Sequence, residues 1–112
     1  MMIKKTFFTI ITLVLLSTNL YSAGTESTSK VKSDYVKAVE SIKWAKKYEQ
    51  KGKTEKANKR YEKAQKLLIK SNEKKPLQAD TLNYLGFTTR KLGDFKNGEI
   101  YYLLGLEVDP NH

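Results

Sequence analysis

Residues 79–112, ADTLNYLGFTTRKLGDFKNGEIYYLLGLEVDPNH, hold two apolar patterns of helical length on either side of a short turn. The turn is the stretch 91–94, KLGD, and the second pattern closes on Asp109-Pro110-Asn111. Apolar residues at three- and four-residue steps predict helices, and a glycine and a proline at these places predict where they end. A helix–turn–helix unit of this length is typical of repeat architectures, in which no single unit buries its own apolar face.

Several positions of this stretch follow a fixed order: a large apolar residue, a Leu-Gly pair, a turn glycine, two aromatic residues and a closing proline. These positions are Leu82, Leu85, Gly86, Gly93, Phe95, Tyr102 and Pro110. The order resembles the tetratricopeptide repeat (TPR) family, whose repeat is about 34 residues long. Three positions depart from the family pattern: Thr89 replaces a tyrosine, and Gly98 and Gly105 replace two alanines.

The two replaced alanines lie in the last predicted helix. Glycine keeps the close helix approach that alanine allows, but each glycine costs roughly 1 kcal/mol of helix propensity relative to alanine. We therefore expect the last helix to form mainly because it packs against its neighbour.

A weaker copy of the same order lies upstream, with Gly52 as its turn glycine. Its other matching positions are Trp44, Ala45, Tyr48, Ala57, Tyr61 and Ala64. In this register Trp44 takes a core position of the motif, which favours a core role over the alternative of a ligand-stacking residue. Gly52 and Gly93 are 41 residues apart, about seven more than one repeat. Because seven residues are close to two helical turns, we expect a longer second helix that continues toward Pro76, which ends it.

The two copies predict an all-α fold, in which two TPR-like helix–turn–helix repeats form a short α-solenoid. The repeats span about 38–78 and 79–112, within a helical domain of residues 34–112. The expected helices run from about Asp34, a candidate N-cap, to Gln50, from near Thr54, from near Asp80, and from just after Asp94.

The first 23 residues have the order of a secretory signal peptide. A basic start at Lys4-Lys5 precedes an apolar run over 7–16 and a small-residue exit that ends at Ala23. We expect the chain to be cleaved after Ser22 or Ala23, to begin with a disordered leader over 24–33, and to be periplasmic or secreted. The alternative is an inner-membrane protein anchored by an uncleaved N-terminal segment, although the apolar run is short against the ~20 residues that span a bilayer.

The charge is divided between the two halves of the chain. Residues 30–75 hold sixteen Lys or Arg against six acids, a net charge of +10, whereas residues 76–112 hold three against five, a net charge of −2. One interpretation is a solvated lysine-rich face, and the other is attraction of an anionic partner, such as a weak contact with the anionic cell-envelope surface. Nucleic acid is not an expected partner, because only one arginine lies in the basic half and no nucleic-acid module is present.

The sequence offers no set of residues for catalysis. Cysteine is absent and the only histidine is His112, the last residue. These counts exclude a cysteine nucleophile and argue against a Ser–His–Asp arrangement. No glycine-rich phosphate loop and no metal-ligand cluster appears. We therefore expect no enzymatic activity and no cofactor.

The TPR resemblance implies an interaction module or scaffold that binds a peptide or protein surface on the concave face made by the first helix of each repeat. The positions on that face correspond to Val39, Ile42, Lys46, Glu49, Asp80, Asn83, Phe87 and Arg90. Of these, we predict partner contacts at Lys46, Glu49, Asn83, Phe87 and Arg90. Family members that grip a C-terminal carboxylate use a Lys/Asn set that this chain does not reproduce, since Ile42 and Phe87 occupy two of its places.

The last predicted helix is apolar on nearly every side, and such a helix is normally buried. Its candidate assembly surface consists of Ile100, Tyr101, Leu103 and Leu104. A second copy of the chain, a different protein, or a lost C-terminal part of a longer repeat protein would cover it. The alternative function is therefore structural self-assembly through the last helix, and we expect the isolated chain to be marginally stable or oligomeric.

Overall fold

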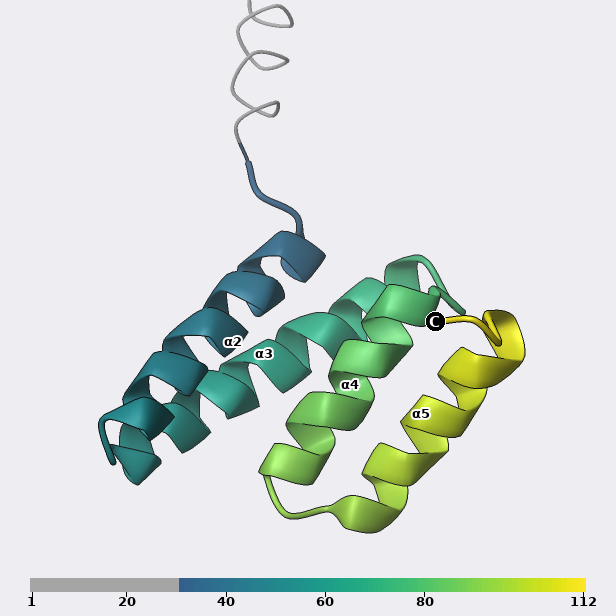
Figure 1. Cartoon of the computed structure of the whole chain (residues 1–112). Coiled ribbons are helices and arrows are strands. Elements are labelled where there is room, and N and C mark those ends of the chain that lie inside the picture. The colour runs from purple at the N-terminus through teal and green to yellow at the C-terminus, as the bar shows by residue number, and fades with distance from the viewer. Residues whose placement is uncertain (1–30) are drawn as a thin grey trace, which may run out of the picture. The chain divides into compact units, whose positions relative to one another are not determined.

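The computed structural model describes residues 31–112, which contain four helices (Figure 1). They are α2 (Asp34–Gln50), α3 (Thr54–Lys74), α4 (Ala79–Lys91) and α5 (Phe95–Val108). Every regular element in this part of the chain is a helix, so the all-α prediction is confirmed. The predicted signal peptide over 1–23 lies outside the described residues, as does most of the predicted leader.

The helices form two hairpins that pack side by side. Helix α2 packs on α3, α3 packs on α4, and α4 packs on α5, as Figure 1 shows. Gly52 turns the chain between α2 and α3 with φ +74°, and Gly93 turns it between α4 and α5 with φ +94°. Glycine adopts this left-handed conformation without the steric cost that a Cβ brings, which confirms both residues as turn glycines.

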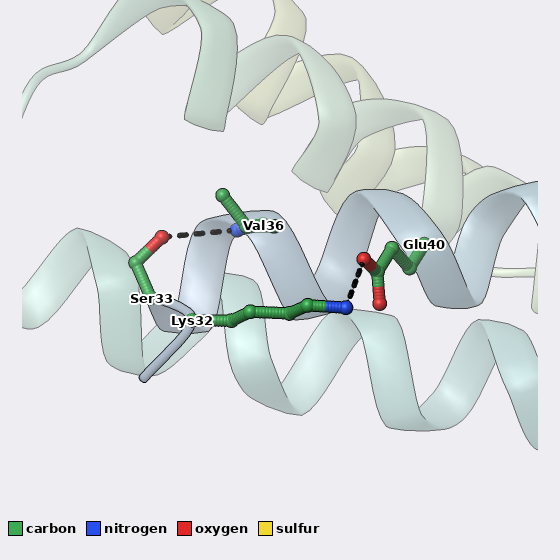
Figure 2. Close-up of polar contacts among 4 residues, drawn as sticks. All are labelled: Lys32, Ser33, Val36 and Glu40. Carbon is green, nitrogen blue, oxygen red and sulfur yellow. Dashed lines mark hydrogen bonds and ion pairs between the residues drawn. The ribbon is translucent and has the colours of Figure 1, made fainter. Parts of the chain in front are cut away.

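The N-cap of helix α2 is Ser33, one residue before the predicted N-cap. The hydroxyl of Ser33 accepts a hydrogen bond from the backbone N–H of Val36 at 3.2 Å, and Lys32 Nζ reaches along the helix to Glu40 at 2.7 Å (Figure 2). Asp34 was the expected cap, but it lies in the first turn and pairs with Lys74 of α3 at 2.8 Å. The end of the predicted leader is therefore bonded to α2, because a serine before the first turn satisfies a free N–H.

Helix α3 is the longest of the four, with 21 residues, and it ends at Lys74. Pro76 follows two residues later and has no N–H with which to continue the helix. The predicted extension of this helix is confirmed. Its length sets the spacing between the two hairpins along the chain.

The main core lies between α2 and α3, with one contribution from α4. Its buried members are Ala38, Ile42, Ala45, Ala57, Tyr61, Ala64, Leu68 and Leu85. The alanines allow α2 and α3 to approach closely, and the larger side chains fill the space beside them. Full burial of a leucine or isoleucine contributes about 1.5–3 kcal/mol, so this core holds most of the hydrophobic stabilisation of the four helices.

Helices α4 and α5 approach each other through glycine. Gly98 and Gly105 are the buried residues of α5. A Cβ on Gly98 would stand 3.1 Å from the carbonyl oxygen of Gly86, and a Cβ on Gly86 would stand 2.7 Å from Tyr102 Cδ1. The expectation that glycines at these positions permit close helix packing is confirmed.

The prediction that Trp44 is a core residue is wrong. Its side chain is 48% exposed, whereas Ala45 beside it is fully buried. The face of α2 that packs on α3 carries Ala38, Ile42 and Ala45. Because Trp44 lies about 100° around the helix from Ala45, its ring does not enter the interface between α2 and α3 and remains about half exposed beside Arg60 of α3.

Candidate functional site

Three of the five predicted partner-binding residues come together where α2 faces α4. Lys46 Nζ of α2 lies 4.9 Å from the centre of the Phe87 ring of α4, and Lys91 Nζ lies 5.6 Å from the same ring. The ring of Tyr61 from α3 packs against the Phe87 ring in a T-shaped contact, with the two ring centroids 5.9 Å apart. Glu49 joins the group through Tyr61 and Lys91. We call Lys46, Glu49, Phe87 and Lys91 the α2–α4 site.

Glu49 is held by two donors. Its carboxylate accepts a hydrogen bond from the buried Tyr61 hydroxyl through Oε1 and a charge-assisted bond from Lys91 Nζ at 3.1 Å through Oε2. The Tyr61 hydrogen bond, followed by Lys91, lowers the pKa of Glu49 against the opposing effect of desolvation. Burial, and then the Glu49 carboxylate, raise the pKa of Tyr61 well above its ordinary range. The pair is therefore an anion and a neutral phenol at neutral pH.

The remaining charge of the site belongs to Lys46. Lys91 is neutralised by Glu49, whereas Lys46 has no ion-pair partner within residues 31–112. A cation beside a partly buried aromatic ring can bind a carboxylate while the ring receives an apolar group. The α2–α4 site can thus hold a short segment that carries both.

Arg90 extends this surface toward α5. Its guanidinium carbon lies 5.9 Å from the centre of the Phe95 ring. Phe87, Arg90, Lys91, Phe95 and Tyr102 line an open cavity of about 330 Å³. A group bound at Phe87 therefore has an open cavity beside it, which Phe95 and Tyr102 of α5 also line.

Asn83 lies apart from the α2–α4 site. It is exposed and lines a smaller cavity of about 190 Å³ with Ala79, Tyr102, Gly105, Leu106 and His112. Ile42, which the family pattern places on the binding face, is only 2% exposed and belongs to the core. Its expected place on the surface is wrong, because it fills the interface between α2 and α3.

The candidate assembly surface on α5 is largely uncovered. Ile100, Leu103 and Leu104 are 46%, 54% and 36% exposed, whereas Tyr101 is half-buried and packs against the core. Further exposed apolar residues of α5 are Phe95, Leu106 and Val108. Helix α5 therefore presents apolar side chains to solvent over most of its length.

The sequence analysis did not predict Lys91 as a member of the α2–α4 site or Tyr61 as a residue that supports it. Lys91 lies four residues after Phe87, which on a helix brings their side chains together, so helical spacing could have identified it. Tyr61 was identified only as an aromatic position of the repeat motif, and its hydrogen bond to Glu49 joins two consecutive helices. No local pattern signals that bond.

Two further features of the described residues bear on function. Residues 31–112 contain no group of three or more His, Cys, Asp or Glu side chains arranged to hold a metal ion. Within the same residues, no helix combines the length and the apolar character needed to cross a bilayer.

Comparison with known proteins adds no relative. No protein-family model, no curated protein and no solved structure matches this chain. The resemblance to the TPR pattern therefore depends on the residues of this chain alone.

Proposed function

We propose that the chain is an exported TPR-type interaction module, whose two repeats bind a peptide or a protein surface on the face shared by α2 and α4. The observation that carries the proposal is the contact between Lys46 of α2 and the Phe87 ring of α4, 4.9 Å apart. Side chains from both hairpins thus form one surface, as a ligand that spans two repeats requires. The role is binding without catalysis.

The α2–α4 site favours a segment with an acidic group next to an apolar side chain. Lys46 supplies the cation for the acidic group, and Phe87 supplies the platform for the apolar one. Arg90 offers a second cation at the neighbouring cavity, where a longer segment would reach. Because Glu49 already neutralises Lys91, a ligand with a single acidic group matches the net charge of the site.

Selection from a random peptide library displayed on phage tests this proposal, with the chain from Gly24 as the bait. We expect the selected peptides to pair acidic with apolar residues. Phe87→Ala and Lys46→Glu should each weaken the best peptide by roughly tenfold or more, as expected for central contact residues.

Lys59→Glu is the matched control, since it makes the same charge change at an exposed position of α3. We expect it to change the affinity by less than about threefold, because exposed charges interact weakly at a distance. Selected peptides that bind the Phe87→Ala and Lys46→Glu variants as tightly as the original chain would contradict the proposed site.

A second candidate function is self-assembly through α5. The observation that favours it is the exposure of Leu103 and Leu104 beside Ile100. Contiguous exposed apolar surface of this kind is typical of protein contacts. Light scattering over a hundredfold range of concentration should then show a dimer or larger species. The double variant Leu103→Asp, Leu104→Asp should be a monomer.

The same double variant separates the two functions. If it is monomeric and still binds the selected peptides, the interaction module is the function and α5 serves assembly only. If it loses peptide binding together with assembly while its helices remain folded, self-assembly is the primary function.

A further inference from the structure

A second exposed surface lies on the side of the first hairpin where Trp44 projects. Trp44 is the only tryptophan of the chain and is 48% exposed. The ring of Tyr48, one helical turn later, lies 6.1 Å from it. An exposed ring and a half-buried ring that packs against the core therefore stand next to each other on α2.

Three cations surround these rings. Lys47 Nζ lies 4.9 Å and the Arg60 guanidinium carbon 5.9 Å from the centre of the Trp44 ring. Lys56 Nζ lies 5.8 Å from the centre of the Tyr48 ring. The cations come from both α2 and α3. We call Trp44, Tyr48, Lys47, Lys56 and Arg60 the Trp44 patch.

The cations of the Trp44 patch have no acidic ion-pair partner among residues 31–112. Asp34, Glu40 and Glu49 of α2 are each paired elsewhere, with Lys74, Lys32 and Lys91. The patch also shares no residue with the α2–α4 site, although Lys46 and Lys47 are adjacent in sequence, because adjacent helical residues point about 100° apart.

We propose that the Trp44 patch is a docking surface for a bilayer that contains anionic phospholipid. Tryptophan and tyrosine favour the headgroup region, where an amphipathic ring contacts both the acyl boundary and water. Lysine and arginine close to an anionic leaflet each add to the attraction. An apolar helix face docked on the patch would cover the rings but leave three cations without partners. An anionic bilayer supplies phosphates for the cations and an acyl boundary for the rings. This inference is independent of the function proposed for the α2–α4 site.

The single tryptophan makes the test direct, since all tryptophan emission of the full chain comes from Trp44. The probe is a vesicle of phosphatidylcholine, with or without phosphatidylglycerol. We expect the emission to shift to shorter wavelength with the anionic vesicles only. Lipids brominated near the headgroup should quench it. Raising the salt to about 1 M, where the Debye length is about 3 Å, should reverse much of the shift.

Matched variants assign the effect to the patch. Lys47→Glu with Arg60→Glu keeps the Trp44 reporter, and the hydrogen bond that Arg60 accepts from Ser41 uses its backbone oxygen, so it is retained. We expect this pair of substitutions to raise the lipid concentration at which half of the emission shift occurs by roughly thirtyfold or more. Lys59→Glu with Lys66→Glu makes the same charge change at exposed positions of α3 and should weaken it only a few-fold. All variants carry the same N-terminal sequence, so the difference between them reports the patch.

Three outcomes would overturn the proposal. The first is unchanged emission with anionic vesicles. The second is an equal loss of vesicle binding in the two double charge variants, which would mean that the overall positive charge of the chain, and not the Trp44 patch, is responsible for binding. The third is a shift that needs no vesicles, rises with protein concentration and disappears in the Leu103→Asp, Leu104→Asp variant. That result would identify a second copy of the chain as the occupant of the patch.

Discussion

The two hairpins have the same architecture and bury different residues. In the first hairpin, α2 and α3 bury alanines together with Ile42, Tyr61 and Leu68. In the second, α5 buries only Gly98 and Gly105, while its leucines and isoleucine remain exposed. Most of the buried core therefore belongs to the first hairpin, whereas α5 of the second hairpin leaves its aliphatic side chains exposed to solvent.

The two hairpins also expose different chemistry. The first exposes aromatic rings surrounded by lysine and arginine, and it lies in the half of the chain with a net charge of +10. The second exposes aliphatic side chains in a half with a net charge of −2. One fold therefore presents an electrostatic surface and a hydrophobic surface on different hairpins. Substitutions that affect one hairpin and not the other measure this difference.

The largest difference should appear between two leucines. Leu68→Ala removes a fully buried side chain from the first hairpin, and we expect a loss of about 2–5 kcal/mol of stability from the transfer and cavity terms together. Leu103→Ala removes a side chain that is 54% exposed, and we expect a change within about 0.5 kcal/mol. Thermal unfolding followed by circular dichroism measures both, and for a unit of this size 1 kcal/mol corresponds to about 4–8 °C.

Leu68→Ala could unfold the chain completely, so Ile42→Val serves as a milder core variant. Ile42 is 2% exposed, and loss of one methyl group there should cost about 0.5–1.5 kcal/mol. Equal effects of Leu68→Ala and Leu103→Ala at the same protein concentration would show that α5 is as well covered as the core. The contrast between the hairpins would then be wrong.

The next effect concerns the glycine contact of the second hairpin. Gly86→Ala places a Cβ 2.7 Å from the Tyr102 ring, and overpacking of this kind costs about 1–3 kcal/mol. Gly105→Ala places a Cβ 3.5 Å from Leu82 Cβ, an ordinary contact, and gains up to about 1 kcal/mol of helix propensity. We expect the first variant to unfold at lower temperature and the second at higher temperature. Two shifts of the same sign would mean that α4 and α5 do not meet as closely as described.

The helices of both hairpins could be predicted from the sequence because their signals are local. Gly52 and Gly93 mark the turns, and Pro76 stops α3 after its extra turns. Each of these residues acts through its own backbone geometry, which does not depend on the rest of the fold. The predicted helix starts were accurate to within one or two residues for the same reason.

The burial or exposure of individual side chains could not be predicted in the same way. Trp44 and Ile42 are two residues apart on α2. The repeat pattern assigned Trp44 to the core, but it lies on the surface. The same pattern assigned Ile42 to the binding face, but it lies in the core. Burial depends on whether another helix lies against a given side, which is a property of the tertiary arrangement. Lys46, Glu49 and Phe87 were predicted by position, but the Tyr61 hydrogen bond that holds Glu49 arises only once α2 and α3 pack together.

The smallest effect is the pH dependence of the bond network at Glu49. The pKa of Glu49 lies below its ordinary value of 4.5 in the folded chain, chiefly because of the Tyr61 hydrogen bond. Its carboxylate therefore stabilises the fold above the pKa of the unfolded state, and this contribution is lost as the pH falls through the folded pKa. Glu49→Gln keeps an acceptor for the Tyr61 hydroxyl but has no charge to titrate.

We therefore expect Glu49→Gln to change stability at neutral pH by less than about 1 kcal/mol, since Glu49 is more than one-third exposed and its pairing with Lys91 is screened by solvent. Below pH 4.5, where Glu49 takes up a proton, the original chain should lose stability faster than the variant. Urea unfolding as a function of pH measures this difference. Asp34→Asn is the control in the first hairpin, because the hydrogen bond from Lys74 likewise lowers the pKa of Asp34, and this ion pair joins α2 to α3. Peptide binding at Phe87 is the second measurement. If acid weakens binding in the original chain and in Asp34→Asn but not in Glu49→Gln, Glu49 also holds the α2–α4 site in its binding geometry. Parallel curves for all three would show that the Glu49 network has no part in joining the two hairpins.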